Sequence, residues 1–367
     1  GEDSNILDEK VFLSKNYDVE YLEYDNSDKL QLVDYISFFT NKNIQSNRKL
    51  IDKIKSFNPD IVYVHNTWFK ASLAIFNVLS KNNIKTLVKL HNFRYDCTRF
   101  FLTKNHLKTD HTCHKCGMIK KRISFFNKYF NESFLKSIFI VVYGKKYFEI
   151  LKRDKLKILV LTNFHKKYLI SLGIESSKIF VFRNPIKISD KKLDVSKKNY
   201  FVYSGRISEE KGVSELINTY LDSNIKEIDL KIVGDGPDLE KLKNKYSKNN
   251  IEFLGLIPNN ESIKIIENSI AVITATKLYE GQPMLLCEAS SLGVPSIFPN
   301  FGGIAEFFPA NTELAFQQFD YGDLLEKINK LCDTDFINKI GIENRNYIEN
   351  KLNSKNLVEQ FESIVNE

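Results

Sequence analysis

The sequence Tyr279-Glu-Gly-Gln-Pro-Met-Leu-Leu-Cys-Glu-Ala289 joins a predicted strand to a predicted helix. The apolar run Ala271–Thr274 lies before it and has the length of a buried strand. Pro283 suits the first position of a helix and Gly293 suits its end, because proline fits the first turn and glycine adopts the left-handed conformation that follows the last. A strand, a glycine-containing loop and a helix in this order form the repeating unit of an α/β fold.

Short apolar runs alternate with stretches of helical period on both sides of this unit. In the first half we predict strands at residues 19–24, 61–65, 86–91, 158–162 and 179–182, and helices at 4–13, 46–56 and 70–79. In the second half we predict strands at residues 200–204, 228–233, 251–254, 271–274 and 295–298, and helices at 212–221 and 239–246. This alternation predicts an α/β fold with two doubly wound, Rossmann-like domains, whose parallel sheets are covered on both faces.

The domain boundary is predicted from a change in composition. Residues 186–199 are polar and charged, lack a regular apolar period and have the character of a linker. We therefore expect an N-terminal domain at residues 1–185 and a C-terminal domain at residues 200–350. A doubly wound domain normally opens with a strand and a glycine loop, whereas here a helix directly follows Gly1-Glu-Asp3. We expect that the first strand is missing from the sequence as given.

The overall composition is that of an ordinary globular protein of 367 residues, or about two domains. Hydrophobic residues make up 43% and charged residues 27%, which excludes collagen-like, disordered and disulfide-stapled small proteins. The apolar runs are strand-sized and no signal peptide opens the chain, so we expect neither a membrane span nor export. Five cysteines, an odd number, favour a reducing compartment, and the expected location is cytoplasmic.

The net charge of +7 is concentrated in one block. Residues 104–157 contain 14 Lys and Arg against 4 Asp and Glu, interleaved with aromatic residues. Such a block can dock on an anionic membrane surface or on nucleic acid. It can equally form solvated helix faces above an aromatic core.

Two carboxylates and a helix start occur together in residues 279–289. The backbone N–H groups of residues 281, 282 and 284 would be unpaired at the positive end of the helix, where they can bind an anion or sugar hydroxyls. Glu280 stands just before that end, and Glu288 about one and a half turns inside the helix. At this spacing the two carboxylates can contact different parts of one elongated ligand.

A cationic loop follows the predicted strand 200–204. Gly205 is followed by Arg206, and Lys211 directly precedes the next helix. Both cations would emerge at the carboxyl end of a strand, where α/β sheets bind ligands, and arginine with lysine suits a diphosphate. The next predicted strand likewise ends in a glycine turn, Val233-Gly-Asp-Gly-Pro237.

In this order and spacing, these motifs closely resemble glycosyltransferase family 4 of the GT-B superfamily. The pattern Glu280-(seven residues)-Glu288, with Glu-Gly-x-Pro-Met inside it, is similar to the hallmark of that family. Gly-Arg-(four residues)-Lys-Gly and Val-Gly-Asp-Gly-Pro lie upstream, as in the family. In the first domain, Leu90-His-Asn92 resembles the active-site histidine segment and Gly1-Glu-Asp3 the end of the N-terminal glycine loop. Phe182-Arg-Asn-Pro185 resembles the segment that enters the interdomain linker.

The resemblance implies a retaining, metal-independent glycosyltransferase that needs no cofactor and uses a nucleotide-sugar donor, a UDP- or GDP-sugar. Arg206 and Lys211 would bind the diphosphate, and Glu288 the ribose hydroxyls. Glu280 and His91 would be the catalytic residues, with Glu280 holding the transferred sugar and His91 facing it across the interdomain cleft. The other donor-binding residues would be Gly281, Gln282, Pro283, Met284 and Gly1.

The expected acceptor is a glycan, in a lipid-linked form, during surface polysaccharide biosynthesis. The basic block would then hold the enzyme as a peripheral protein on the inner membrane face. The resemblance also implies that a C-terminal helix at residues 351–367 packs back on the N-terminal domain.

Two motifs suggest metal sites. Cys97, Cys113 and Cys116 include a Cys-x2-Cys pair and could hold a structural zinc ion, with His106 and His111 nearby, or remain unligated thiols. Asp333-Thr-Asp335 has the Asp-x-Asp pattern of metal-binding carboxylates, but it lies between two helical stretches and is better explained as a helix N-cap. We expect no catalytic metal.

Two alternative functions remain open at the level of sequence. The chain could have another GT-B activity, that of a nucleotide-sugar epimerase or a phosphorylase. It could also be a nucleic-acid-binding module built on residues 97–157, although no nucleic acid is expected as a partner of the glycosyltransferase.

Overall fold

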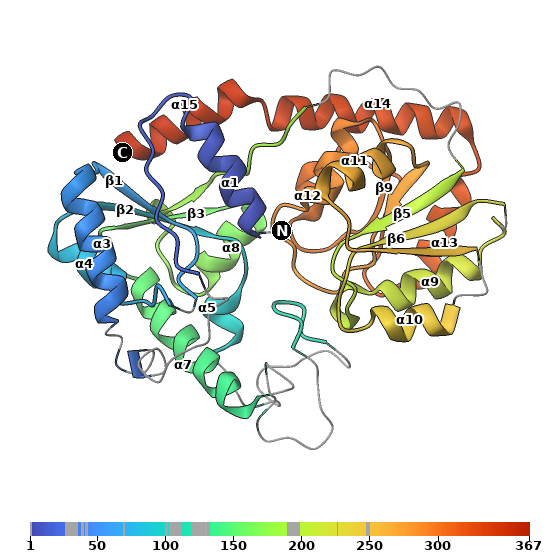
Figure 1. Ribbon diagram of the computed structural model, residues 1–367. Helices are drawn as coiled ribbons and strands as arrows, with labels where there is room; N and C mark the ends of the chain where they lie inside the picture. The colour runs from blue at the N-terminus through green and yellow to red at the C-terminus, as the bar shows by residue number, and fades with distance from the viewer. Residues whose placement is uncertain are drawn as a thin grey trace. The chain divides into compact units, whose positions relative to one another are not determined.

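The computed structural model describes residues 2–25, 36–37, 40, 43–68, 70–99, 102, 112–118, 126, 129, 133–188, 199–225, 227–246 and 250–367, with residues 2–4 described by their backbone alone. These residues form two compact units (Figure 1). Unit 1 comprises residues 1–183 and 360–367, and unit 2 comprises residues 184–359. Gly1, His106, His111, much of the basic block and most of the predicted linker lie outside the described residues.

Unit 1 contains a parallel sheet with the strand order β1-β2-β3-β4. Its strands are β1 (Ile61–Val64), β2 (Lys85–Leu90), β3 (Leu156–Val160) and β4 (Ile179–Val181). Its helices are α1 (Glu2–Leu13), α3 (Ile44–Phe57), α4 (Ile75–Lys81), α5 (Arg94–Cys97), α7 (Phe134–Leu151) and α8 (Asn163–Ser171). Because all four strands are parallel, the loops after β1 and β2 meet at one edge of the sheet.

Two predictions for unit 1 are wrong. The predicted strand at residues 19–24 has no strand structure, because it lies along α3 without joining the sheet, and Tyr24 donates a hydrogen bond from its hydroxyl to the Ser46 carbonyl oxygen at 2.9 Å. The predicted helix at residues 70–79 begins only at Ile75, because Ser72 has a φ of 55° and a left-handed residue cannot continue an α-helix.

Helix α7 shows where some aromatic residues of the basic block lie. Tyr143, Tyr147 and Phe148 of this helix are all buried in unit 1. For the aromatic residues of α7, the interpretation as a core beneath a solvated face is therefore confirmed at these three positions. The first turn differs, because the side chains of Phe134 and Leu135 are 52% and 66% exposed.

Unit 2 contains a parallel sheet with the strand order β10-β9-β8-β5-β6-β7. The strands are β5 (Tyr200–Ser204), β6 (Asp229–Val233), β7 (Ile251–Gly255), β8 (Ala271–Ile273), β9 (Ser296–Pro299) and β10 (Ala315–Phe316). The helices are α9 (Val213–Leu221), α10 (Leu239–Tyr246), α11 (Asn259–Glu267), α12 (Met284–Ser291), α13 (Tyr321–Lys330), α14 (Thr334–Lys351) and α15 (Ser354–Asn366), the last of which continues into unit 1.

The second sheet is buried on both faces. Phe201 and Tyr203 of β5 belong to one hydrophobic cluster, whereas Val202 between them belongs to another. This alternation is expected because successive side chains of a strand point to opposite faces. Strands β6 and β7 lie on one side of β5, and strands β8 to β10 lie on the other side. The sheet therefore has a switch point between β5 and β8, where loops diverge and doubly wound sheets bind ligands.

The end of the chain packs in unit 1. The ring of Phe361 in α15 lies 5.6 Å from that of Tyr17, 5.9 Å from that of Tyr63 and 5.3 Å from that of Phe182, measured between ring centroids. Gln360 donates a side-chain hydrogen bond to the Val181 carbonyl oxygen at 2.7 Å. Asp333 is the N-cap of α14 and accepts hydrogen bonds from the Asp335 and Phe336 N–H groups, which confirms that prediction. None of the described helices is both long enough and apolar enough to cross a membrane.

Candidate functional site

The loops after β5 and β8 meet at the switch point of unit 2. Gly212, at the end of the β5 loop, has a φ of 67° and packs against the β8 loop, where an added Cβ would lie 2.0 Å from the Ala275 carbonyl oxygen. The β6 loop packs equally closely, since a Cβ on Gly234 would lie 1.9 Å from the Gly205 carbonyl oxygen. These two positions require glycine because only a residue without a Cβ permits such an approach of the backbones.

An ion pair joins two residues that are 69 positions apart in the sequence. The Lys211 ammonium lies 2.5 Å from Oε1 of Glu280, and Thr276 donates a hydrogen bond to the same oxygen at 3.0 Å. The side chains of Lys211 and Glu280 are 27% and 23% exposed, so solvent and a ligand can still reach them. The family resemblance implies that Lys211 binds the diphosphate and Glu280 the sugar of one donor, and the structure places the two side chains in direct contact.

A buried tyrosine shapes the loop that carries Arg206. The Tyr203 hydroxyl donates a hydrogen bond to the Arg206 carbonyl oxygen at 2.7 Å. Burial raises the pKa of Tyr203 well above its usual value, and the negative charges of Glu280 and Glu210 raise it further. The hydroxyl therefore remains protonated as a donor, and the side chain of Arg206 extends from this loop into solvent.

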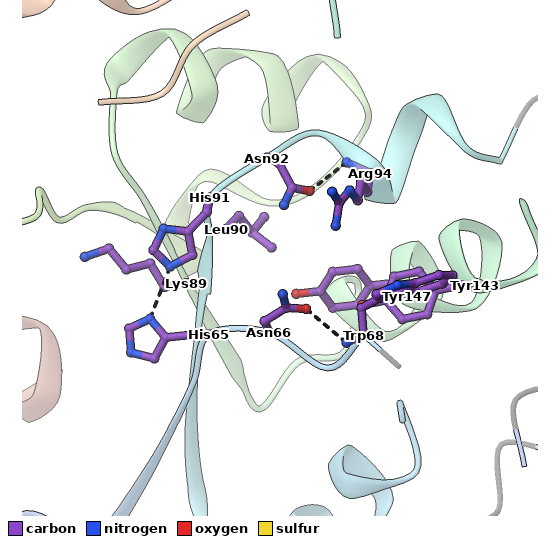
Figure 2. A pocket seen from close by; sticks show the side chains of 10 residues that line it. All are labelled: His65, Asn66, Trp68, Lys89, Leu90, His91, Asn92, Arg94, Tyr143 and Tyr147. Carbon is purple, nitrogen blue, oxygen red and sulfur yellow. Dashed lines mark hydrogen bonds between the residues drawn. The ribbon is translucent and has the colours of Figure 1, made fainter. Parts of the chain in front are cut away.

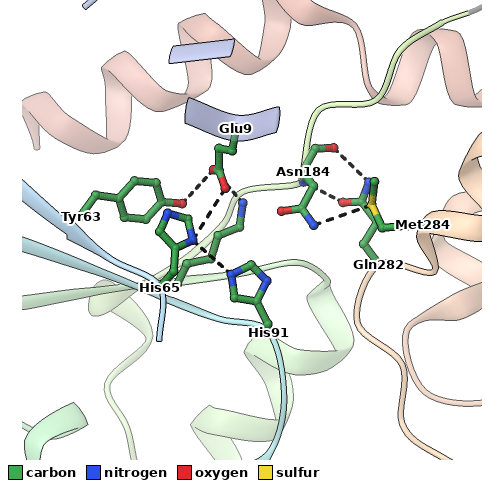
Figure 3. Close-up of polar contacts among 8 residues, drawn as sticks. Glu9, Tyr63, His65, His91, Asn184, Gln282 and Met284 are labelled. Atoms are coloured by element: carbon green, nitrogen blue, oxygen red, sulfur yellow. Dashed lines mark hydrogen bonds and ion pairs between the residues drawn. The ribbon is translucent and has the colours of Figure 1, made fainter. Parts of the chain in front are cut away.

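The loop between β8 and α12 differs from the prediction in one position and in two side-chain roles. Pro283 is the N-cap of α12, one position before the first helical residue, and its carbonyl oxygen accepts hydrogen bonds from Leu286 and Cys287. The Gln282 side chain accepts from the Asn184 N–H group at 2.7 Å and donates to the Asn184 carbonyl oxygen at 3.0 Å (Figure 3). Asn184 also donates to the Met284 sulfur at 3.8 Å.

The side chain of Gln282 therefore holds the backbone at Asn184, whereas the Met284 sulfur contacts the side-chain amide of Asn184. The prediction that residues 281–284 bind a ligand therefore rests on the backbone N–H groups of residues 281, 282 and 284, since Pro283 has none. Glu288 is the fifth residue of α12 and is half-buried.

Unit 1 has a pocket at the carboxyl ends of β1 and β2, whose volume of about 330 Å³ includes space that is open to solvent. His91, predicted from the sequence, lines this pocket together with residues that the sequence did not single out (Figure 2). The Trp68 ring packs edge-on against Tyr143, with 5.1 Å between ring centroids. Polar walls complete the pocket, which is lined by His65, Asn66, Trp68, Lys89, Leu90, His91, Asn92, Arg94, Tyr143 and Tyr147.

A buried ion pair between Lys89 and Glu9 lies close to His65, one of the two histidines that line the pocket. The Lys89 ammonium contacts Oε1 of Glu9 at 2.8 Å, and the Tyr63 hydroxyl donates to the same oxygen at 2.9 Å. The side chains of Lys89 and Glu9 are 0% and 1% exposed. Burial lowers the pKa of Lys89, although Glu9 opposes this effect. The only signal in the sequence was a lysine inside an apolar strand, because Glu9 lies 80 positions away.

Burial, together with the charge of Lys89, lowers the pKa of His65 and of His91 to about 3 each. Both rings are therefore neutral near pH 7. His65 was not singled out in the sequence, since a single histidine after a strand carries no pattern of its own.

Cys97 and Cys113, which are buried, form a thiol cluster with the half-buried Cys116. Burial raises the pKa of Cys116, whose thiol is hydrogen-bonded with those of Cys113 and Cys97. All three are free cysteines. Within the described part of the chain, no group of three or more His, Cys, Asp or Glu side chains could hold a metal ion. Since His106 and His111 lie outside the described residues, the structural zinc ion and the unligated thiols both stay predictions.

Residues 186–354 match the family model described as "Glycosyl transferases group 1". Among curated proteins, the capsular polysaccharide biosynthesis glycosyltransferase CapM of Staphylococcus aureus is 29% identical over 205 residues, which cover 53% of each chain. The matched region thus spans about half the length of that relative.

Solved structures of low sequence identity have the same fold. The structure of the G117R mutant of S. aureus TarM in complex with fondaparinux, alpha-GlcNAc-glycerol and UDP has a TM-score of 0.64 at 17% identity, covering 88% of this chain and 58% of that one. The structure of Anabaena HepE in complex with UDP has a TM-score of 0.63 at 14% identity, covering 87% and 81%. The predicted fold class is therefore confirmed: the chain has the GT-B fold, and residues 186–354 resemble group 1 glycosyl transferases.

Proposed function

We propose that the protein is a retaining glycosyltransferase that moves a sugar from a nucleotide-sugar donor to a glycan acceptor in surface polysaccharide synthesis. The match of residues 186–354 to group 1 glycosyl transferases and the similarity to CapM support the proposal. The observation that carries it is the contact between Lys211 and Glu280 at the switch point of unit 2, with the exposed Arg206 on the same loop as Lys211.

The donor is a sugar linked to UDP or GDP, and its diphosphate is the leaving group. When the bond to the sugar breaks, negative charge develops on the phosphate oxygens, and preorganised cations stabilise that charge. Arg206 and Lys211 supply these cations. Glu280 and the N–H groups of residues 281, 282 and 284 hold the sugar, and Glu288 holds the ribose hydroxyls. The acceptor hydroxyl attacks on the face from which the phosphate departs, and the phosphate takes up its proton.

Lys211 must release Glu280 when it binds the diphosphate. The pair is about one quarter exposed, and ion pairs at such positions contribute little, about 1 kcal/mol or less. A charge-assisted hydrogen bond to phosphate exceeds this value at about 1.5–3 kcal/mol. The exchange is therefore favourable, and it leaves the Glu280 carboxylate available to sugar hydroxyls.

The pocket of unit 1 is the proposed acceptor site. Trp68 and Tyr143 offer the aromatic surface on which sugar rings pack, and Asn66 and Asn92 stand among the polar groups of the wall. His91 lies in the same wall, as expected for a residue near the reacting sugar.

A lipid-linked acceptor requires the enzyme to reach a membrane surface, and the start of α7 is the proposed contact. Phe134 and Leu135 are exposed there, next to Lys136. Exposed apolar side chains beside cations favour an anionic bilayer. Cosedimentation with vesicles containing anionic lipid tests this contact. Leu135→Ser, and charge reversal at Lys120, Lys121 and Arg122, should each reduce binding, whereas unchanged binding would contradict it.

A thermal-shift screen of nucleotide-sugars, followed by analysis of the products of the best binder, tests the proposed activity. Transfer of the sugar with unchanged anomeric configuration, and release of a nucleoside diphosphate, is the expected result. An epimerised sugar nucleotide or a sugar phosphate would instead identify an epimerase or a phosphorylase. Tight, salt-sensitive binding of RNA, with no response to any nucleotide-sugar, would favour the nucleic-acid-binding alternative.

A further inference from the structure

Two histidines meet in unit 1, where two neighbouring parallel strands end. His65 directly follows β1 and His91 directly follows β2. Nδ1 of His65 lies 3.1 Å from Nε2 of His91, and the rings stack with 5.5 Å between their centroids (Figure 3). Two imidazole nitrogens at this distance share one hydrogen, so one ring donates and the other accepts. Which ring donates decides what the remaining nitrogen of His91 can do.

Burial is the main reason why both rings stay neutral, because it lowers the pKa of each histidine, and the surrounding charged groups modify this effect. Lys89 acts on both histidines, Glu9 acts on His91 in the opposite sense, and His165 adds a small effect on His91. Lys89 and Glu9 are themselves buried and paired. The two rings together therefore carry no extra proton near pH 7, and the shared hydrogen belongs to one tautomer or the other.

The position of Glu9 favours one of these tautomers. Its Oε1 accepts from Lys89 and Tyr63, whereas its Oε2 is buried without a hydrogen-bond partner, 3.9 Å from Nδ1 of His65. A carboxylate oxygen favours a hydrogen over a lone pair on a neighbouring nitrogen, because the hydrogen carries positive partial charge. The shared hydrogen therefore belongs on Nδ1 of His65, and Nε2 of His91 accepts it.

We propose that His65 is a positioning residue that fixes His91 as its Nδ1–H tautomer, so that His91 can offer a ligand only a hydrogen-bond donor. This inference rests on the proposed function where it names the ligand group, which is an oxygen of the sugar or of the departing phosphate. In that role His91 stabilises an oxygen and does not act as a general base. Its Nδ1 has no lone pair with which to take the proton of the acceptor hydroxyl.

Nitrogen-15 NMR of the whole protein labelled at its 6 histidines tests the tautomer directly. Protonated and unprotonated ring nitrogens have well-separated shifts, and the variants His65→Asn and His91→Asn assign the signals. The expected spectrum shows His91 protonated at Nδ1, with no change between pH 5 and pH 8. A His91 ring protonated at Nε2, or one that titrates in this range, would overturn the proposal. Tyr63→Phe is a matched control, because it removes one hydrogen bond to Oε1 of Glu9 and keeps the ring that packs on His65 with 4.3 Å between centroids, so His91 should stay protonated at Nδ1.

Kinetics of two His65 variants provide the second readout. Asparagine places an N–H donor near the position of Nδ1, whereas leucine removes it. His65→Leu should lower kcat/KM by about three- to tenfold, the range expected for one lost hydrogen bond, and His65→Asn should restore most of it. Equal losses in both variants would contradict a positioning role. If the tautomer is as expected but no nucleotide-sugar is used, the proposed function fails and the assignment of His65 stands.

Discussion

The substitution Glu280→Gln separates the binding of the diphosphate from the transfer of the sugar. Oε1 of Glu280 lies 2.5 Å from the Lys211 ammonium, so we expect a nucleoside diphosphate to compete with Glu280 for that lysine. Glutamine keeps the size of the side chain and removes its charge. An ion pair exposed to this degree contributes about 0.2–1 kcal/mol, which corresponds to an affinity for UDP that is about 1.4- to fivefold tighter in the variant.

Sugar transfer should change in the opposite direction. Glu280 is the carboxylate proposed to hold the sugar, and loss of such a charged contact lowers kcat/KM by about one hundredfold. Isothermal titration with UDP and GDP measures the first effect, and a transfer assay with the donor found in the screen measures the second.

Lys211→Met provides the background that tests the competition. In that variant, diphosphate affinity should fall by about tenfold or more, and adding Glu280→Gln should produce no further tightening. If Glu280→Gln weakens UDP binding in the otherwise unchanged protein, the carboxylate contributes to the nucleotide site, and the assignment of Lys211 and Glu280 to different parts of the donor is wrong.

Three further predictions concern unit 1. Lys89→Met should destabilise the protein by about 3–5 kcal/mol in urea unfolding, because it leaves Glu9 charged and buried, and the double variant Lys89→Met with Glu9→Leu should recover most of this loss. The pKa of His65 and of His91 is lowered to about 3, so the unfolded state binds more protons than the folded state between about pH 3 and 6.5. The free energy of unfolding should therefore rise with pH over this range, by up to 1.4 kcal/mol per pH unit per histidine, and then level off. A free energy of unfolding that falls over this range would contradict the burial of the pair. Trp68→Ala should raise the KM for the acceptor and leave UDP affinity unchanged, and an unchanged KM would remove Trp68 from the acceptor site.

Local patterns in the sequence were sufficient for most of the fold. The strands β5 to β9 could be predicted because each is a short apolar run followed by a glycine or polar turn. Asp333 could be predicted as an N-cap because a capping side chain acts on the N–H groups of the next turn. The segment 19–24 has a strand-like composition, but pairing depends on a neighbouring strand that composition does not reveal.

In the candidate sites too, local sequence patterns predicted some features, whereas contacts between distant segments required the structure. The spacing of Lys211 and Glu280 placed both at strand ends, although the ion pair between them required the structure. Gln282 belongs to a recognisable motif, but its side-chain partner is the backbone of Asn184, which no sequence pattern identifies. Lys89 and Glu9 come from a strand and a helix that are far apart in the chain, so only the folded arrangement shows that their charges neutralise one another.

The contact between Gln282 and Asn184 has a consequence for how substitutions act at the first residue of unit 2. Both hydrogen bonds reach the main chain of residue 184, so changing its side chain leaves them in place, and only proline, which lacks the N–H group, would abolish one. At position 282, by contrast, the side chain itself makes both hydrogen bonds, so substitutions there would disturb them. Glutamate there could still accept from the amide but would bring a second acceptor against the carbonyl oxygen. Chain entry into this unit therefore depends on a single carboxamide in the loop before α12, which contacts the main chain of residue 184 and not its side chain.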